Sequence, residues 1–438
     1  MFVLKHIYLY RNMTIEELYS VYLQSTGVIT DTRKIIKGNL FFALKGENFN
    51  GNLFALQAIQ NGALAAVVDE EDYSDPERGI FYFENSLFTL QNLARYHRNQ
   101  LNIPVIGLTG SNGKTTSKEL ISSVLKEKFK VLYTQGNLNN HIGVPLTVLS
   151  IKPEHEIAII EMGANHQKEI ELLVGISQPT IGYITNFGKA HLEGFGGEEG
   201  VIKGKSELYT FLREFNKIAL VNSDDYKQME LTENIERITF GSKGYYKFSL
   251  AVSYNHGISV EYEKTIINSQ LTGEYNFTNI CAAISLGLFY DLSISQIKCG
   301  IESYKPKNQR SQIVEKNGIT LLLDTYNANP SSMEVSLKNF SSFIGSKTII
   351  IGDMFELGRE SATEHQKIVD LAESLGFEFI YLVGENFYKT KNNSSNIKKF
   401  RSTEEIKNYV KTHKISTQNI LLKGSRGMTL EKLIDYII

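Results

Sequence analysis

The sequence predicts an α/β protein of three domains, and three observations support this fold class. The chain of 438 residues is long enough to form more than one hydrophobic core. An apolar run, a glycine-rich loop and a helical pattern follow one another around residue 110. Apolar runs alternate with helical patterns over the last part of the chain, as in a doubly wound parallel sheet. We expect domains at residues 1–100, 101–305 and 306–438.

The composition is that of a globular protein, with 42% hydrophobic and 21% charged residues and a net charge of −2. This charge gives no electrostatic reason to expect a nucleic acid or an acidic membrane as a partner. No apolar run approaches the roughly 20 residues of a membrane span, and the N-terminus lacks the pattern of a secretion signal. The two cysteines, Cys281 and Cys299, lack metal or redox spacing and favour a reducing compartment. We therefore expect a cytoplasmic protein.

Residues 1–100 have the pattern of a small α/β domain. Thr14 and Glu17 have the spacing of a capping box, which predicts the start of a helix. Thr32 and Arg33 belong to a polar cluster that could bind an anionic ligand or could be cap and turn residues, and these residues alone favour the second interpretation. The expected elements are a helix over 13–22, a strand over 40–44, a helix over 55–60 and a strand over 65–68.

A glycine-rich stretch over residues 107–116, Gly-Leu-Thr-Gly-Ser-Asn-Gly-Lys-Thr-Thr, carries the strongest functional signal. It lies between an apolar run at 103–106 and apolar residues at helical spacing, which is the context of a phosphate-binding loop. Glycines let backbone amides approach an anion, the helix N-terminus adds its dipole, Lys114 adds a positive charge, and Thr115 can place a hydroxyl on Mg²⁺. The usual pattern has a glycine where this chain has Leu108. We still predict a nucleotide-binding loop rather than an ordinary turn, formed by Gly110, Ser111, Asn112, Gly113, Lys114, Thr115 and Thr116.

Two further apolar runs are followed by residues that suit a site. Glu161 ends the run at 157–160, and an acid at the carboxyl end of a strand beside a phosphate loop can hold Mg²⁺ or orient water. His191 follows the run at 181–184 on the same expected edge of the sheet. The alternatives are a glutamate that points to solvent and a structural histidine, which is the commoner role of a lone histidine.

Several asparagines of the central region have two interpretations. Asn139 and Asn140, in the stretch 136–145, could offer amides to a ligand or form a plain loop. Asn279 precedes an expected helix over 280–288, where it could contact a base or cap the helix.

Lys203 and Lys205 are expected to lie at the start of a helix that begins within residues 203–207. Positive charges at that end oppose the helix dipole, which is mildly unfavourable. The lysines therefore either have a function or are simply solvated.

Residues 306–438 show the alternation of a doubly wound sheet without a G-x-G-x-x-G motif, so a dinucleotide site is not indicated. The expected strands are 320–323, 348–351, 379–383 and 420–422. Polar clusters follow three of them, at 324–330, 352–354 and 423–426. Because ligands of open α/β sheets bind beyond the carboxyl ends of strands, we expect these clusters to share one crevice.

Taken together, these motifs resemble those of the Mur ligases, the ATP-dependent amide-forming enzymes of peptidoglycan synthesis. The glycine loop, Glu161 and His191 are shared across that family. The wordings Asn-Leu-Asn-Asn, Gly-Ala-Asn-His and Tyr-Asn-Ala-Asn-Pro point to the branch that adds D-alanyl-D-alanine. The resemblance covers nearly the whole chain, and its most specific segments are 136–145, 161–166, 191–195, 324–330, 352–358 and 423–426.

The resemblance implies a small N-terminal α/β domain that holds a UDP-sugar, a central P-loop domain that holds ATP, and a C-terminal Rossmann-like domain that closes over both. It implies UDP-N-acetylmuramoyl-tripeptide, D-alanyl-D-alanine and ATP as substrates, and an acyl phosphate as the activated species. Nucleic acid is not implied as a partner, and a monomer is the default expectation.

The resemblance also implies roles for single residues. Thr115 and Glu161 would hold one Mg²⁺, and His191 with a carbamoylated Lys205 would hold a second. Lys114, Lys205 and His191 would act in catalysis. The other implied contacts are Asn279, Arg310 and Asp324 for ATP, and Thr32, Arg33, Asn139, Asn140, Tyr326, Asn327, Asn329, Lys423, Ser425 and Arg426 for the substrates.

Three positions qualify this assignment. Gln309 stands where the family usually has a glycine, and Asn52 stands where a histidine is common. Lys203 competes with Lys205 for the carbamate, and the spacing to Tyr209 favours Lys205.

The nearest alternatives are a sibling ligase that adds one amino acid and a folate polyglutamylating enzyme. A P-loop switch that hydrolyses ATP to change shape is a more distant one.

Overall fold

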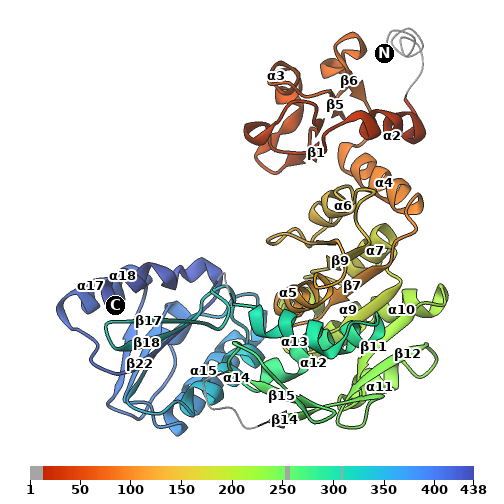
Figure 1. Cartoon of the computed structure of the whole chain (residues 1–438). Helices are drawn as coiled ribbons and strands as arrows, with labels where there is room; N and C mark the ends of the chain where they lie inside the picture. The colour runs from red at the N-terminus through yellow and green to blue at the C-terminus, as the bar shows by residue number, and fades with distance from the viewer. Residues whose placement is uncertain (1–12, 252–256, 307–308) are drawn as a thin grey trace.

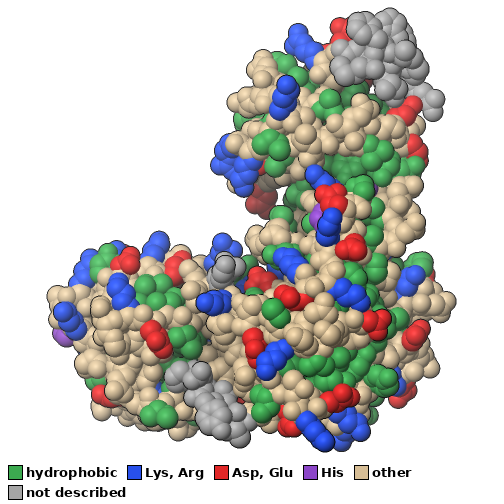
Figure 2. All heavy atoms as spheres, viewed as in Figure 1, with side chains coloured by type: hydrophobic (Ala, Val, Ile, Leu, Met, Phe, Trp, Pro, Cys, Tyr) green, Lys and Arg blue, Asp and Glu red, His purple; other side chains and the backbone are tan. Residues whose placement is uncertain are grey.

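The computed structural model describes residues 13–251, 257–306 and 309–438, which form three α/β domains with separate sheets (Figure 1). The first domain lies at one end of the molecule and is joined through α4 (Ser86–Asn99) to the central domain, which the C-terminal domain flanks (Figure 1). Figure 2 shows an open angle between the first and C-terminal domains, with acidic and basic side chains interspersed over the visible face. Within the described ranges, no helix has both the length and the apolar character needed to cross a membrane.

The first domain is built on a parallel sheet of four strands in the order β1-β2-β5-β6. The predicted capping box is confirmed, because the side chains of Thr14 and Glu17 each accept a hydrogen bond from the other residue's amide. α4 attaches this domain to the central one through Arg98, which donates to the carbonyl oxygens of Ser177 and Gln178. The other elements are α2 (Ile15–Gln24), β1 (Val28–Ile29), β2 (Leu40–Phe42), β3 (Lys45–Gly46), β4 (Phe49–Asn50), α3 (Ala55–Gln60), β5 (Ala65–Val68) and β6 (Ile80–Tyr82).

The central domain contains a parallel sheet of seven strands in the order β13-β12-β11-β10-β7-β9-β8. In the register of this sheet, Leu108 of β7 is opposite Glu161 of β9. On the other side of β7, Thr109 is opposite Ile184 of β10. The carboxyl ends of β9, β7 and β10 therefore meet at one edge, which brings the glycine loop, Glu161 and the segment before His191 together.

The predicted apolar runs at 157–160 and 181–184 match β9 and β10 within one residue, whereas β7 begins two residues after the run at 103–106 and α12 begins five residues before the predicted 280. The strands are β7 (Val105–Thr109), β8 (Val131–Tyr133), β9 (Ile157–Glu161), β10 (Ile181–Ile184), β11 (Ile218–Asn222), β12 (Arg237–Gly241) and β13 (Tyr246–Lys247), with β14 (Ser249–Ala251), β15 (Ser259–Tyr262) and β16 (Thr265–Asn268) in a small antiparallel sheet. The helices are α5 (Lys114–Leu125), α6 (Gly143–Val148), α7 (Glu169–Ser177), α8 (Leu192–Phe195), α9 (Glu198–Lys205), α10 (Glu207–Glu214), α11 (Tyr226–Leu231), α12 (Tyr275–Phe289) and α13 (Ile294–Ser303).

A helix does begin within residues 203–207, since α10 starts at Glu207, but the expectation that Lys203 and Lys205 lie at its start is wrong. Lys203 and Lys205 lie in the last turn of α9, where positive charge is favourable to the helix dipole. The helix begins earlier because Gly196 and Gly197 both have positive φ and turn the chain before Glu198.

The C-terminal domain contains a sheet of six strands in the order β17-β18-β22-β19-β20-β21, in which β17 is antiparallel and the other neighbours are parallel. The ends of β18, β22 and β19 are adjacent, so the three predicted polar clusters do lie together. The strands are β17 (Gln312–Lys316), β18 (Ile319–Asp324), β19 (Lys347–Gly352), β20 (Phe379–Val383), β21 (Ile397–Phe400) and β22 (Asn419–Lys423). The helices are α14 (Pro330–Ser341), α15 (Ser361–Ser374), α16 (Glu385–Tyr388), α17 (Thr403–Thr412) and α18 (Ile434–Ile437).

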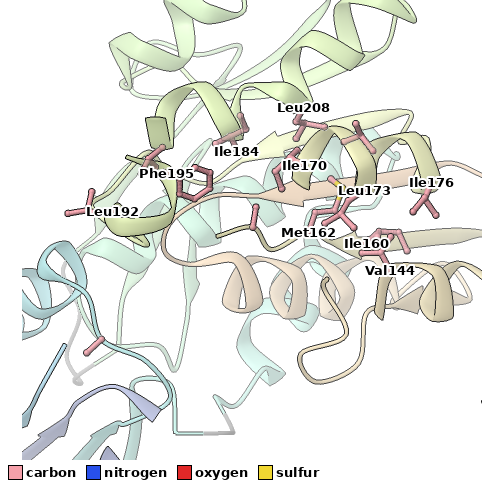
Figure 3. Packing of buried hydrophobic residues seen from close by; sticks show 14 of the residues in the cluster. Val144, Ile160, Met162, Ile170, Leu173, Ile176, Ile184, Leu192, Phe195 and Leu208 are labelled. Carbon is pink, nitrogen blue, oxygen red and sulfur yellow. The ribbon is translucent and has the colours of Figure 1, made fainter. Parts of the chain in front are cut away.

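A buried apolar cluster fixes the segment that carries His191. Leu192 and Phe195 of α8 are both 3% exposed and belong to the core that covers β9 and β10. Because full burial of such a side chain is worth about 1.5–3 kcal/mol, this short helix is held firmly against the sheet. The labelled members of the cluster in Figure 3 are Val144, Ile160, Met162, Ile170, Leu173, Ile176, Ile184, Leu192, Phe195 and Leu208.

Candidate active site

A cavity of about 850 Å³ lies between the central and C-terminal domains. The glycine loop borders it on the central side, and the ends of β18 and β22 border it on the C-terminal side. Of the residues singled out in the sequence, those that line it are Ser111, Asn112, Gly113, Lys114, Thr115, Thr116, Asn139, Asn140, Glu161, His191, Asn279, Arg310, Asp324, Tyr326, Asn327, Asn329 and Lys423.

Two glycines of the loop occupy positions where a side chain would not fit. Gly110 has φ +142, and a Cβ there would lie 1.9 Å from Oγ1 of Thr185. Gly113 has φ +80, and a Cβ there would lie 2.7 Å from Oδ1 of Asn279. The loop is thus closely packed against its neighbours, and its shape depends on glycine at these two positions.

Lys114 is held within the loop. Its Nζ donates hydrogen bonds to the carbonyl oxygens of Gly110, at 2.6 Å, and Ser111, at 3.3 Å. Burial lowers the pKa of Lys114 to about 8. The negative charge of Glu161 opposes this shift, and the positive charge of Arg310 adds to it. Two cations converge on the cavity, so an anion between them would be stabilised by both.

Asn112 links the two domains directly. Its Oδ1 accepts a hydrogen bond from Nδ2 of Asn329 at 2.8 Å, and its amide donates to Oδ1 of Asn186 at 3.1 Å. Ser111 donates to the carbonyl oxygen of Gly188 at 2.6 Å. These contacts order the glycine loop from outside the loop itself.

Glu161 is almost fully buried and has three partners. Oγ1 of Thr115 lies 3.1 and 3.0 Å from its two carboxylate oxygens, and Nδ2 of Asn139 donates to Oε1 at 2.9 Å. The buried ammonium of Lys118 lies 3.6 Å from Oε2. Lys118 is not among the residues predicted from the sequence, although its position one helical turn after Lys114 indicates that both face the same way.

His191 adopts φ 53, in the left-handed region, and precedes α8. Its Nδ1 contacts Oε2 of Glu356, which belongs to the C-terminal domain. This hydrogen bond lowers the pKa of the Glu356 carboxyl. Glu161 is buried and therefore does not point to solvent, and the side chains of Glu161 and His191 both line the cavity.

Lys203 and Lys205 differ in burial although only one residue separates them. Lys203 is exposed, whereas Lys205 is 1% exposed, and its Nζ lies 5.2 Å from the centre of the Phe195 ring. Burial, with the nearby charge of Lys114, lowers the pKa of Lys205 well below its usual value. Lys205 lies behind the residues that line the cavity rather than among them.

Asn279 lies within α12, because the helix begins at Tyr275, and it is not a helix cap. Its Oδ1 accepts from Ser117 Oγ at 2.9 Å, and its Nδ2 donates to Oδ1 of Asn276 at 2.9 Å. The helix-cap alternative is therefore wrong, because residues 275–278, which precede Asn279, are already helical.

On the C-terminal wall, Lys423 forms an ion pair with Asp324, its neighbour across the strands β22 and β18. The guanidinium of Arg310 stacks on the Tyr326 ring, 3.6 Å from its centre, and its buried Nε has no hydrogen-bond partner within the described residues. Asn327 accepts a hydrogen bond from the amide of Ala328.

The remaining predicted residues lie outside this cavity. Ser425 Oγ accepts a hydrogen bond from the amide of Phe355 at 3.0 Å, so it supports a neighbouring loop. The Arg426 guanidinium lies 5.3 Å from the centre of the Tyr326 ring. Thr32 and Arg33 are in the first domain, where Arg33 is exposed and forms an ion pair with Asp31.

The two residues that depart from the family pattern both make hydrogen bonds within their own domains. Gln309 has φ 58, a conformation that favours glycine, and its Oε1 accepts a hydrogen bond from Thr325 at 2.9 Å. Asn52 is fully buried and donates to Asp69 Oδ1 at 2.8 Å. Both residues thus have structural partners in this chain.

The residues present fit one Mg²⁺ site directly. The hydroxyl of Thr115 and the carboxylate of Glu161 are the oxygen ligands that Mg²⁺ uses beside phosphates. Among the described residues there is no group of three or more His, Cys, Asp and Glu side chains that could hold a metal ion.

Family models match each of the three domains. The model described as Mur ligase family, catalytic domain, matches residues 24–108. The Mur ligase middle domain matches 108–287, and the Mur ligase, glutamate ligase domain, matches 309–426.

Individual proteins match over almost the full length. The UDP-N-acetylmuramoyl-tripeptide--D-alanyl-D-alanine ligase of Buchnera aphidicola subsp. Baizongia pistaciae is 33% identical over 435 residues, covering 96% of this chain and 94% of the relative. The crystal structure of MurF from Acinetobacter baumannii has a TM-score of 0.86 and 31% identity, covering 97% of this chain and 98% of that chain. MurF ligase from Thermotoga maritima in complex with ADP has a TM-score of 0.83 and 27% identity, covering 95% and 97%.

Proposed function

Because the chain belongs to the Mur ligase family, we propose that it joins D-alanyl-D-alanine to a UDP-N-acetylmuramoyl-tripeptide with hydrolysis of ATP to ADP and phosphate, in peptidoglycan synthesis. Relatives that match over nearly the whole chain are named for this reaction. The observation that carries the proposal is the cavity of about 850 Å³, which the glycine loop and the Thr115–Glu161 pair share with the Asp324–Lys423 pair.

ATP would bind with its phosphates against the glycine loop. Lys114 and Arg310 supply positive charge on two sides, and the α5 N-terminus adds its dipole. Asn279, Arg310 and Asp324 line the cavity and are our candidates for contacts with the nucleotide. The ADP complex of the Thermotoga maritima relative supports nucleotide binding by this fold.

The reaction needs an activated carboxyl group, since a carboxylate is a poor electrophile. An oxygen of the tripeptide carboxylate attacks the γ-phosphorus, the bond to the β–γ bridging oxygen breaks, and ADP leaves. The amine nitrogen of D-alanyl-D-alanine, in its neutral form, then attacks the acyl carbon, the C–O bond to phosphate breaks, and the nitrogen releases one proton to phosphate or water. The first step is phosphoryl transfer, so the chain contributes mainly positioning and charge neutralisation, with Lys114 facing the negative charge of two reactants.

Mg²⁺, when bound, would neutralise phosphate charge, and Thr115 and Glu161 would hold it. For a second ion we propose His191 together with a carbamate of Lys205. The lowered pKa of Lys205 favours the neutral amine, whose nitrogen can add to the carbon of CO₂ with loss of one proton. The carbamate would turn this buried neutral amine into an anionic ligand, and the exposed Lys203 lacks this environment.

The first domain would hold the UDP-sugar, with Thr32 and Arg33 as candidate contacts. Asn139, Asn140, Tyr326, Asn327, Asn329 and Lys423 would contact the peptide substrates in the cavity, with Ser425 and Arg426 beside it. Because the substrate is a nucleotide-linked precursor, we place the reaction in the cytoplasm.

ADP release by the purified chain tests the function. We expect release from Mg²⁺–ATP only when UDP-N-acetylmuramoyl-tripeptide and D-alanyl-D-alanine are both present. Turnover with a single amino acid in place of the dipeptide would indicate a sibling ligase, and turnover with folate and glutamate would indicate a polyglutamylating enzyme. ATP hydrolysis at the same rate without a carboxylate acceptor would indicate a P-loop switch and contradict the proposal.

A further inference from the structure

The motif at residues 352–358 lies at the end of β19, outside the chemistry described so far, and it reaches across the domain boundary. Nδ1 of His191 contacts Oε2 of Glu356, and the amide of Glu193 donates to the carbonyl oxygen of Glu356 at 3.3 Å. Both the side chain and the main chain of Glu356 therefore bind the segment that carries His191.

The loop that presents Glu356 is firmly supported from the C-terminal domain. The amide of Met354 donates to Nε2 of the buried His365 at 3.0 Å. The carboxylate of Asp353 accepts hydrogen bonds from the amides of Asn386 and Phe387, both at 2.9 Å. With these supports, the direction of the Glu356 side chain is set by the domain and not by the loop alone.

Both partners of this contact have unusual backbone conformations. His191 has φ 53 and Glu356 has φ 62, and residues other than glycine rarely adopt such backbone angles. Gly358, two residues on, has φ 53, and a Cβ there would lie 3.1 Å from Cβ of Glu193. Such conformations persist where the surroundings over-determine them, often at functional sites.

A histidine that binds a metal usually donates its other ring N–H to a carboxylate, which fixes its orientation and tautomer. His191 lines the cavity and its Nδ1 is occupied by Glu356, so Nε2 is the nitrogen left for an ion. The two residues come from different domains, which makes this arrangement dependent on how the domains meet.

We propose that Glu356 is a positioning residue that orients His191 toward the second metal ion of the proposed function. The site of this ion is then complete only when the C-terminal domain is docked on the central one. The inference rests on the proposed function for its metal. It also predicts the state of His191 in the metal-free protein, which can be tested separately.

A second ion pair between the same domains provides the matched control. Nζ of Lys189 lies 3.6 Å from Oε1 of the buried Glu364, without touching His191. Glu364→Gln and Glu356→Gln are the same chemical change, and each removes the negative charge from one contact between the domains; Glu364 also pairs with Lys367 of its own domain. A role limited to holding the domains together predicts similar effects of both.

The first measurement is ¹⁵N NMR of the metal-free full chain labelled at histidine, with the His191 signal identified by its loss in His191→Gln. We expect the proton on Nδ1 in the wild type and in Glu364→Gln, and a shift toward the Nε2–H tautomer in Glu356→Ala. A wild-type His191 with its proton on Nε2, or a signal unchanged in Glu356→Ala, would overturn the proposal.

The second measurement is Mn²⁺ binding to the ADP-bound chain by electron paramagnetic resonance. In Glu356→Ala we expect one ion to bind about 10- to 100-fold more weakly, as for other removed partners of metal-binding histidines. Glu356→Gln should lose less, because its amide oxygen still accepts from Nδ1, and Glu364→Gln should match the wild type. Equal Mn²⁺ affinity in Glu356→Ala and wild type contradicts the proposal, whereas a wild type that binds no Mn²⁺ contradicts the proposed function.

Discussion

Thr115 and Glu161 are joined by a hydrogen bond in which the threonine hydroxyl lies 3.1 and 3.0 Å from the two carboxylate oxygens. The two residues are 46 positions apart and come from adjacent parts of the fold, the start of α5 and the end of β9. A buried carboxylate needs partners, and Thr115, Asn139 and Lys118 supply them. The pair is therefore ordered before any ion arrives.

Replacement of Glu161 tests this pair. Glu161→Gln keeps the shape and removes the negative charge, so we expect nucleotide-dependent Mg²⁺ binding to weaken and kcat/KM to fall on the order of 10²-fold or more. Steady-state ADP release and calorimetric Mg²⁺ titration in the presence of ADP measure the two effects. Glu171→Gln, on the exposed side of α7, is the matched control and should behave as wild type. Unchanged Mg²⁺ affinity in Glu161→Gln would argue against metal binding by this residue.

The carbamate is tested at Lys205. We expect Lys205→Ala to lose most activity, and short carboxylic acids added to the buffer to restore part of it by occupying the vacated space. Lys203→Ala changes the same residue type on the same helix at an exposed position and should retain activity. A ¹³C NMR signal of a carbamate from ¹³CO₂, present in wild type and Lys203→Ala and lost in Lys205→Ala, gives a readout independent of turnover. Near-wild-type activity of Lys205→Ala would remove this role.

Glycine at position 113 is a requirement of the loop. Gly113→Ala would strain a backbone at φ +80 by about 1–2 kcal/mol and bring Cβ to 2.7 Å from Asn279 Oδ1. We expect ADP affinity to fall by at least about tenfold and the thermal midpoint to drop. Gly136→Ala is the control, because that glycine has φ +55 but nothing within 4 Å of the added Cβ. It should share the strain and keep ADP affinity, and equal affinities in both variants would show that the loop tolerates the close contact.

The attachment of the first domain should weaken in acid. Burial lowers the pKa of His97, whose Nε2 lies 2.9 Å from the carbonyl oxygen of Ile151 in the central domain. The folded-state pKa is below the unfolded value of 6.5, so the unfolded chain takes up the proton first as the pH falls. The contribution to stability is present above pH 6.5 and is lost as the pH falls through the folded-state pKa.

Thermal midpoints of wild type and His97→Gln between pH 7.5 and 5 measure this effect. The wild-type midpoint should fall more steeply than that of the variant. Burial also lowers the pKa of His365, but this residue is present in both proteins and cancels in the comparison. Parallel curves for the two proteins would exclude His97 as the group responsible.

Much of the fold could be predicted because its signals are local. The apolar runs that become β5, β10 and β20 were predicted to the residue, because the pattern of a short buried strand can be recognised from the residues of that strand alone. The start of α9 was missed because two glycines with positive φ, not the apolar pattern, decide where that helix begins.

The sequence alone was enough to recognise the glycine loop with Lys114 and Thr115, and the acid and histidine that follow two strands, because strand order and residue type place them on one edge of a sheet. It could not show that His191 meets Glu356, 165 positions away in another domain, since that contact depends on how the domains meet. The spacing to Tyr209 favoured Lys205 over Lys203, but it could not show that the two lysines differ in burial. The side chains of residues two positions apart on a helix point in directions about 200° apart. Only the packing around α9 decides which of Lys203 and Lys205 is buried.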